Sequence, residues 1–324
     1  MRGGLIIAVM FLLLVIGISV LVFTYHKTGA ISSMAVVETS GKIDVYFCHS
    51  DNCTTPWIKA LSSGALCAIY DISRGDLITK LNSVKAKVVV DNGMTDKQTW
   101  KLNDVRIDSD NGLMHNKWCV MGDTVVTGSH NPTANTNYDN MIVVASKGIA
   151  ANYRDEFLEL WNGKFGRGNR VRKPVIRIGD ITLENYFCPE DDCEENVRRA
   201  LMSANRTIDV MAFSFTSDPL GKTLVLKKKG GVLVRSMTDK GQLNEYSEDY
   251  LLNRSGVPVK AFDGPSRTLL HHKVFIVDGA IVVTGSANPT SSGYHKNDEN
   301  VIIIHSKEIA RKYTEEFERI WAIA

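Results

Sequence analysis

The sequence contains two copies of one pattern, and this repeat constrains the fold more than any other feature. The tripeptide Tyr-Phe-Cys at 46–48 recurs at 186–188, and in each copy a second Cys follows five residues later. The segment Thr-Gly-Ser-x-Asn-Pro-Thr at 127–133 recurs at 284–290. Similarity that returns in the same order over such a length indicates internal duplication. We therefore expect two similar domains in tandem.

Each copy ends in the same amphipathic helix. Apolar residues at helical spacing over 149–161 recur at matching positions over 309–321. Upstream, β-rich runs such as 86–90 and 207–215 alternate with helical stretches such as 194–203. This alternation predicts an α/β fold with mixed β-sheets flanked by helices.

The repeat and its flanks divide the chain into four expected segments. A stretch between the copies is interrupted by Gly, rich in Arg and Lys, and followed by Pro174, which favours an exposed connection over a phosphate-binding patch. We expect an anchor with a short linker at 1–35, a first repeat at 36–166, a basic linker at 167–174 and a second repeat at 175–324.

The N-terminal segment predicts a transmembrane helix. Leu5–Phe23 is an uncharged run of 19 residues, which at about 1.5 Å rise per residue nearly spans a hydrocarbon core of about 30 Å. A cleaved signal peptide and a buried core helix are the alternatives. Charges on the two sides of the run hardly differ, so the positive-inside rule leaves its orientation open.

The overall charge excludes a strongly basic protein. Lys and Arg total 38 against 36 for Asp and Glu, which gives a formal net charge of +2. Such a balance provides no global attraction for polyanions, so any site for an anion must be local.

The second copy predicts a hairpin that gathers polar side chains. His271 and Lys273 are two residues apart on a β-rich run, so both side chains leave the same face of the strand. A two-residue turn at Asp278-Gly279 would place His271 opposite Ser286, with Asn288 further along. His, Lys, Ser and Asn should therefore converge. The same parity sends His272 to the other face, and we interpret His272 and His130 as packing or solvated residues.

These residues resemble the signature of the phospholipase D superfamily, His-x-Lys-x4-Asp followed by Gly-Ser-x-Asn. The second copy matches it fully at 271–278 and 285–288. In the first copy Gly122 stands at the expected Asp position and Asp123 comes one residue late. The resemblance implies that two copies in one chain form a covalent, pseudo-two-fold version of a dimer. It also implies that Asp123 and Asp278 hold the hairpin turns. The corresponding residues of the first copy are His115, Lys117, Ser129 and Asn131.

This set of residues suits the cleavage of a phosphodiester without a metal or other cofactor. In-line attack needs a neutral imidazole on one side of phosphorus and a protonated imidazole on the other. Lys117 and Lys273 would neutralise charge on the nonbridging oxygens. The phosphate-binding Ser and Asn residues are expected to be Ser129, Asn131, Ser286 and Asn288.

The resemblance also implies roles for the two histidines. His115 is expected to attack phosphorus and form a phosphohistidine, with His271 as general acid, although the near symmetry leaves the reverse assignment open. A carboxylate that accepts from the second imidazole nitrogen would fix the tautomer. Asp139 is expected to pair with His115, and Glu299 with His271.

Six cysteines bear on the compartment. The equal spacing of Cys48 with Cys53 and of Cys188 with Cys193 favours two local disulfides, with a zinc site or free thiols as alternatives. Cys67 and Cys119 lie in apolar runs and are expected to be buried free thiols. Disulfides and an anchor together favour a single-pass membrane protein whose catalytic domain is extracytoplasmic.

The motifs define a reaction centre more closely than a substrate. We favour a membrane-anchored phosphoric diester hydrolase acting on phospholipids, with Leu5–Phe23 in the bilayer and no obligatory protein partner. An endonuclease is the alternative, since Lys227, Lys228 and Lys229 add local positive charge. A phosphatidyl transferase and a noncatalytic phosphate-binding protein are further alternatives.

Overall fold

The computed structural model describes residues 35–95 and 99–324. The predicted membrane segment Leu5–Phe23 lies outside the described residues. Within the part of the chain that is described, none of the helices has the length and apolar character needed to cross a bilayer. Residues 36–324 form one compact unit.

The first copy of the repeat forms a seven-stranded mixed sheet in the order β2-β8-β7-β6-β3-β4-β5. Neighbours from β2 to β3 in this order are antiparallel, whereas β3, β4 and β5 run parallel to one another. The bounds are β2 (Lys42–Phe47), β3 (Leu66–Ile69), β4 (Lys87–Val90), β5 (Val105–Ile107), β6 (Lys117–Met121), β7 (Thr124–Gly128) and β8 (Asn140–Ala145).

The second copy repeats this sheet strand by strand. Its order β10-β16-β15-β14-β11-β12-β13 has the same sequence of antiparallel and parallel neighbours. Two further strands extend it, because β1 pairs in parallel with β9 and so adds residues from the start of the first copy to the second sheet. The bounds are β1 (Val36–Glu38), β9 (Val175–Ile178), β10 (Ile181–Cys188), β11 (Thr207–Ala212), β12 (Leu233–Asp239), β13 (Val259–Phe262), β14 (Lys273–Val277), β15 (Ile281–Gly285) and β16 (Glu299–His305).

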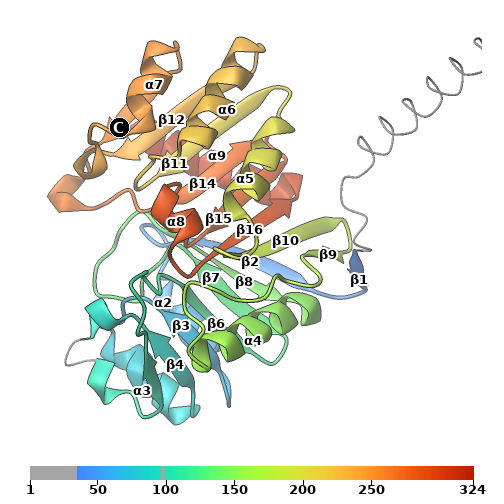
Figure 1. Ribbon diagram of the computed structural model, residues 1–324, viewed down its shortest axis with the longest axis vertical. Coiled ribbons are helices and arrows are strands. Elements are labelled where there is room, and N and C mark those ends of the chain that lie inside the picture. Colours follow the sequence, from blue (N-terminus) through green and yellow to red (C-terminus); the bar gives the residue numbers. More distant parts are fainter. Residues whose placement is uncertain (1–34, 96–98) are drawn as a thin grey trace, which may run out of the picture. The chain divides into compact units, whose positions relative to one another are not determined.

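Helices cover both sheets (Figure 1). The α-helices are α2 (Thr54–Ala60), α3 (Gly75–Ser83), α4 (Lys147–Trp161), α5 (Cys193–Met202), α6 (Asp218–Lys229), α7 (Glu248–Arg254), α8 (Ser291–His295) and α9 (Lys307–Trp321). Short 3-10 helices are η1 (Asn92–Met94), η2 (Thr99–Lys101), η3 (Lys240–Gln242) and η4 (Pro265–Arg267). The predicted α/β fold of mixed sheets flanked by helices is confirmed.

Three apolar clusters form the core. The largest joins both sheets and contains the apolar faces of α4 and α9, including Tyr153, Phe157, Tyr313 and Phe317. A second cluster lies where α5 and α6 pack on the second sheet. A third lies where α2 and α3 pack on the first sheet. The shared cluster therefore holds the two copies of the repeat against each other.

All six cysteines form disulfides. Cys48 pairs with Cys53 and Cys188 with Cys193, as predicted. The expectation of free thiols at Cys67 and Cys119 is wrong, because these residues lie directly opposite each other on β3 and β6 and are bonded. Strands that are distant in sequence bring this third pair together.

The register of the β14–β15 hairpin differs from the prediction by one residue. Val277 pairs with Ile281 and Phe275 with Val283, so His271 is not directly opposite Ser286. Asp278 and Gly279 do form the turn, which Ala280 closes by donating to the carbonyl of Val277. Ala280 then adds one residue before the ladder begins, and this extra residue shifts the register.

Candidate active site

Each histidine of the motif is tied to the opposite copy of the repeat through its backbone. The amide of His115 donates to the carbonyl of Asp298 at 2.9 Å, and the amide of His271 donates to the carbonyl of Tyr138 at 3.0 Å. Parallel β-bridges join Met114 to Asp298 and Tyr138 to Leu270. These contacts bring the start of β6 beside the start of β16, and the start of β14 beside the start of β8.

The carboxylate of each histidine comes from the other copy. Nδ1 of His115 lies 2.8 Å from Oε1 of Glu299, and Nδ1 of His271 lies 2.7 Å from Oδ1 of Asp139. The predicted pairing of Asp139 with His115 and of Glu299 with His271 is therefore wrong, because the backbone bridges place each acid beside the histidine of the other repeat. With Nδ1 held by a carboxylate, Nε2 is the nitrogen left for a substrate.

The two lysines are buried with the histidines. Lys117 is fully buried and Lys273 is 2% exposed. Each Nζ donates to the carbonyl of its own motif histidine at 2.6 Å. Each also lies over an aromatic ring, at 4.9 Å from the centre of Tyr70 and 5.2 Å from that of Phe213. The same two rings pack edge-on against His115 and His271, which fixes the imidazoles from the side.

Burial and mutual repulsion make the four basic groups reluctant to hold protons. Burial lowers the pKa of Lys273 to about 7, with a further contribution from Lys117, and burial lowers that of Lys117 to about 8. Burial and Lys273 lower the pKa of His271 to about 4, although Asp139 opposes this shift. The pKa of His115 falls well below its ordinary value because of burial, Lys117 and Lys273. The protonation of each of these four groups therefore depends on the others, and a bound anion would stabilise their charged forms.

The pKa values of the two carboxyl groups, Glu299 and Asp139, shift in opposite directions. Burial raises the pKa of Glu299 to about 8, although Lys117 opposes this. Burial acts in the same direction on Asp139, but the charge of His271, its hydrogen bond and the nearby His130 outweigh it, so the pKa of Asp139 falls well below its ordinary value.

The Ser and Asn residues of the motifs lie next to these pairs. The hydroxyl of Ser129 donates to Oδ1 of Asp139 at 2.9 Å, and Oγ of Ser286 accepts from the amide of Asn300 at 2.9 Å. Within residues 35–95 and 99–324, the Oδ1 atoms of Asn131 and Asn288 are buried without a hydrogen bond. The serines thus support the acids and the backbone, whereas the two Asn side chains have unused polar atoms in the site.

The two hairpin turns begin with a residue in the same conformation, although two residues separate Met121 from Thr124 and three separate Val277 from Ile281. Gly122 has φ +52° and Asp278 has φ +54°, both in the left-handed region. The carboxylate of Asp278 also accepts from the amides of Asn205, Arg206 and Thr207. Asp123 contributes its carbonyl, which accepts from the amide of Ser146. Glycine therefore provides the left-handed residue that opens the shorter turn of the first copy.

Two buried asparagines complete the site and were missed by the sequence analysis. Oδ1 of Asn140 accepts from Thr284 at 2.7 Å and from Tyr313 at 3.1 Å, and Nδ2 of Asn300 contacts Thr127 at 3.0 Å and Tyr153 at 2.9 Å. Every one of these bonds joins one copy to the other. The available signal was the Asn that directly follows both Asp139 and Glu299.

Of the two expected states, packing or solvated, His272 is in the first: it is buried, and its Nδ1 contacts Nδ2 of Asn140 at 3.0 Å. His130 is also buried, with Nδ1 3.7 Å from Oδ2 of Asp139. Both histidines therefore touch residues of the site rather than solvent.

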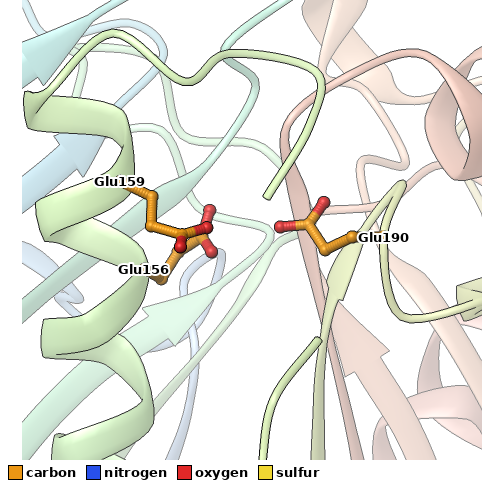
Figure 2. A group of neighbouring side chains, drawn as sticks. All are labelled: Glu156, Glu159 and Glu190. Atoms are coloured by element: carbon orange, nitrogen blue, oxygen red, sulfur yellow. The ribbon is translucent and has the colours of Figure 1, made fainter. Parts of the chain in front are cut away.

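One acidic cluster outside the motifs has the geometry of a cation site. Figure 2 shows that Glu156 and Glu159 of α4 point towards Glu190, which follows β10, and one oxygen of each lies within 4.8 Å of the others. Burial raises the pKa of Glu190 to about 7 and that of Glu156 well above its ordinary value, with added repulsion from neighbouring acids. Glu156 and Glu190 therefore resist ionisation in this cluster.

Comparisons with known proteins identify the family of the chain. A family model described as cardiolipin synthase, PLD-like domain, matches residues 73–161 and 197–321, which is well over half of the chain. The chain belongs to the phospholipase D superfamily.

Individual relatives within this superfamily resemble parts of the chain. The mitochondrial cardiolipin hydrolase of Homo sapiens is 39% identical over 124 residues, covering 38% of this chain and 48% of that protein. A phospholipase D of Rickettsia felis is 27% identical over 176 residues, covering 53% of this chain and 87% of that protein. The chain thus spans only about half the length of the human relative. The crystal structure of a phosphatidylserine synthase from Haemophilus influenzae shares the fold, with a TM-score of 0.64, 12% identity, and coverage of 88% of this chain and 87% of that one.

Proposed function

We propose that this protein is a phosphoric diester hydrolase that acts on phospholipids through a phosphohistidine, with no metal in the reaction. One observation carries the proposal. Two histidines, each oriented by a carboxylate of the other repeat, share a buried site with Lys117 and Lys273. Such a site offers a nucleophile, an acid and fixed positive charge for one phosphate.

In the first step, Nε2 of His115 attacks phosphorus and a P–N bond forms as the bond to the leaving oxygen breaks. That oxygen takes the proton from Nε2 of His271. In the second step, water gives a proton to His271 and attacks phosphorus, which breaks the P–N bond and frees His115. Throughout, Lys117 and Lys273 stabilise the charge on the nonbridging oxygens, and Asn131 and Asn288 donate to them.

The two repeats, 36–166 and 175–324 on either side of the linker 167–174, are proposed to act as a covalent pseudo-two-fold dimer. Their matching strand orders and crossed His–acid pairs support this arrangement. Neither repeat would form the site alone, since each lacks the carboxylate for its own histidine. No additional protein partner is then needed for catalysis.

The phospholipid substrate and the membrane location rest on further support. The apolar run Leu5–Phe23 would hold the enzyme at a bilayer as a single-pass anchor. Two relatives are named cardiolipin hydrolase and phospholipase D. Three disulfides favour an extracytoplasmic position for the catalytic part.

The test compares substrates in the presence of EDTA. Residues 36–324 are incubated with vesicles containing fluorescent phosphatidylcholine or cardiolipin, and separately with single- and double-stranded DNA. We expect lipid cleavage that His115→Asn and His271→Asn each abolish. Cleavage of DNA alone would replace the lipid hydrolase by the endonuclease alternative. A new diester on addition of a primary alcohol would establish transfer as a second activity, because an acceptor other than water can capture the intermediate.

A further inference from the structure

The two copies of the repeat have an aromatic ring at the same position beside the active site, although the residue differs. Tyr70 follows β3 in the first copy, and Phe213 follows β11 in the second. The residues next to them are unlike, since Asp71 follows Tyr70 and Ser214 follows Phe213. The two copies therefore share the ring and not the hydroxyl group of Tyr70.

Backbone hydrogen bonds fix both rings against the motifs. The amide of Tyr70 donates to the carbonyl of Asn116, and the amide of Phe213 donates to that of His272, each at 2.8 Å. Asn116 and His272 are the residues between His and Lys in the two motifs. Each ring is thus tied to the segment that carries the lysine it contacts.

Packing in the core does not explain the two rings. Both side chains are partly exposed, and neither belongs to the three apolar clusters that the described residues form. Nζ of Lys117 lies over the ring of Tyr70 at 4.9 Å, and Nζ of Lys273 lies over that of Phe213 at 5.2 Å. An ammonium within about 6 Å of a ring centre is attracted to the negative π face, and more strongly where it is removed from water. The rings therefore contact buried cations rather than the core.

The ammonium groups of Lys117 and Lys273 have few other partners. Each donates to the carbonyl of its own motif histidine at 2.6 Å, and within the part of the chain that the structure describes neither forms an ion pair. The carboxylates of Glu299 and Asp139 are held by the histidines instead. Because an ammonium has three N–H donors, each lysine retains N–H groups for a phosphate oxygen.

We propose that Tyr70 and Phe213 are positioning residues whose rings stabilise the charged forms of Lys117 and Lys273 in the buried site, in place of a paired acid. The inference rests on the proposed function and deepens it, because these charges bind the phosphate. A carboxylate paired with either lysine would occupy its N–H groups and cancel its charge. A π face attracts the charge and leaves N–H groups for the substrate.

Other groups also act on the two lysines. Burial has the largest effect and lowers the pKa of Lys117 to about 8 and that of Lys273 to about 7, the latter with a contribution from Lys117. The motif histidines pack against the same two rings. The acids that oppose the fall in pKa are Glu299, Asp139, Asp71 and Asp91 for Lys117, and Asp139 and Glu299 for Lys273. These acids remain when a ring is removed, so the contribution of the ring can be measured by itself.

The first test is the pH profile of variants that lack a ring. If Tyr70→Leu lowers the pKa of Lys117 by about one unit, kcat/KM should fall about fivefold at pH 8 and less than about 1.5-fold at pH 6. Phe213→Leu should show a loss of about fivefold near pH 7, where Lys273 titrates. The rates are measured on vesicles that contain fluorescent phosphatidylcholine. Equal losses at every pH would overturn the proposal, because a ring that only shapes the site affects all pH values alike.

Exchange of the two residues keeps a ring in each copy. Tyr70→Phe and Phe213→Tyr should retain the wild-type profile, and a profile displaced as far as in the leucine variants would contradict the proposal. Trp161→Leu is the matched control, because it removes the ring from another cation–π pair, in which Nζ of Lys87 lies 5.0 Å from the ring centre. The control should leave the profile in place. A displacement in Trp161→Leu would also count against the proposal, since the effect would not need a ring beside the active site.

A measurement without turnover separates this inference from the proposed function. In NMR titrations of 13Cε-labelled lysine, Lys273 of Phe213→Leu should lose its proton about one pH unit lower than in the wild type, and Phe213→Tyr should restore the wild-type value. An unmoved Lys273 in the folded leucine variant would exclude the role of the ring, whatever substrate the enzyme prefers. A wild-type protein that cleaves no diester, while Phe213→Leu shows the shift, would instead contradict the proposed function alone.

Discussion

At the scale of single residues, each motif histidine depends on a carboxylate from the other copy of the repeat. His115, Lys117, His271 and Lys273 follow from a motif that occurs twice, and the structure buries all four in one site. The crossing of Asp139 to His271 could not be read from spacing, because each acid lies closer in sequence to the histidine of its own copy. The contact depends on backbone bridges between the copies, which no local pattern records.

The crossed pairs can be tested by replacing one acid at a time. Asp139→Asn should lower kcat about 100-fold, because His271 loses the carboxylate that stabilises its imidazolium. In NMR spectra the Nδ1 resonance of His271 should move, while that of His115 should stay. Glu299→Gln is the matched variant and should move His115 instead. If the Nδ1 resonance of His115 moved in Asp139→Asn instead, each acid would pair with the histidine of its own copy.

The buried lysines predict a fall in activity at alkaline pH. Lys273 and Lys117 must be protonated to bind a phosphate, and their pKa values are about 7 and about 8 in the free enzyme. The value of kcat/KM should therefore decline as the pH rises from about 7 to about 9. Lys117→Ala should lower kcat/KM about 100-fold or more at every pH. A wild-type profile that stays level up to pH 10 would show that the lysines keep their protons in the folded enzyme.

At the scale of elements, the sequence predicted which strands exist better than how they align. The strand and helix patterns at 207–215 and 194–203 correspond to β11 and α5. The register of β14 against β15 differed by one residue because Ala280 enters the hairpin after the turn. The prediction of free thiols at Cys67 and Cys119 is wrong because their pairing requires β3 to lie beside β6, which reflects sheet order rather than local sequence.

The disulfide between β3 and β6 should contribute more stability than a local one. Cys67–Cys119 spans a sequence separation of 52 residues, against 5 for Cys48–Cys53. In the chain-entropy model these loops correspond to about 4 and about 2 kcal/mol. The loss of unfolding free energy in Cys67→Ala/Cys119→Ala should therefore be about twice the loss in Cys48→Ala/Cys53→Ala. Both losses are measured by urea denaturation of residues 36–324. Equal losses would mean that loop closure does not determine the contribution of these bonds.

At the scale of the whole molecule, duplication explains most of what could be predicted. A repeated motif implied two equivalent sheets, and the structure has them in the same strand order. The contacts that join the copies were not predictable, because residues such as Asn140 and Asn300 find their partners only across the interface. The same holds for Glu156 and Glu190, which come from different copies and lie close together (Figure 2).

Because Glu190 is buried near Glu156, the stability of the folded protein should depend on pH. The pKa of Glu190 is about 7 in the folded protein and about 4.3 in an unfolded chain, so the folded state binds more protons between these values. Stability should therefore be greatest below about pH 4.3 with respect to this group, fall as the pH rises to about 7, and then level off. Glu190→Gln removes the ionised form, so its melting temperature should exceed that of the wild type by about 2 °C or more at pH 8, with a smaller difference at pH 5.

Glu195 provides a matched control because its pKa shifts in the opposite direction to that of Glu190. Its hydrogen bond and ion pair with Arg198 lower the pKa of this carboxyl, so Glu195→Gln should produce no gain in melting temperature at pH 8. Equal gains for Glu190→Gln at pH 5 and pH 8 would show that the amide improves packing rather than relieving charge. A loss at pH 8 would show that the Glu190 carboxylate is stabilised where it lies between the two copies, for example by a bound cation.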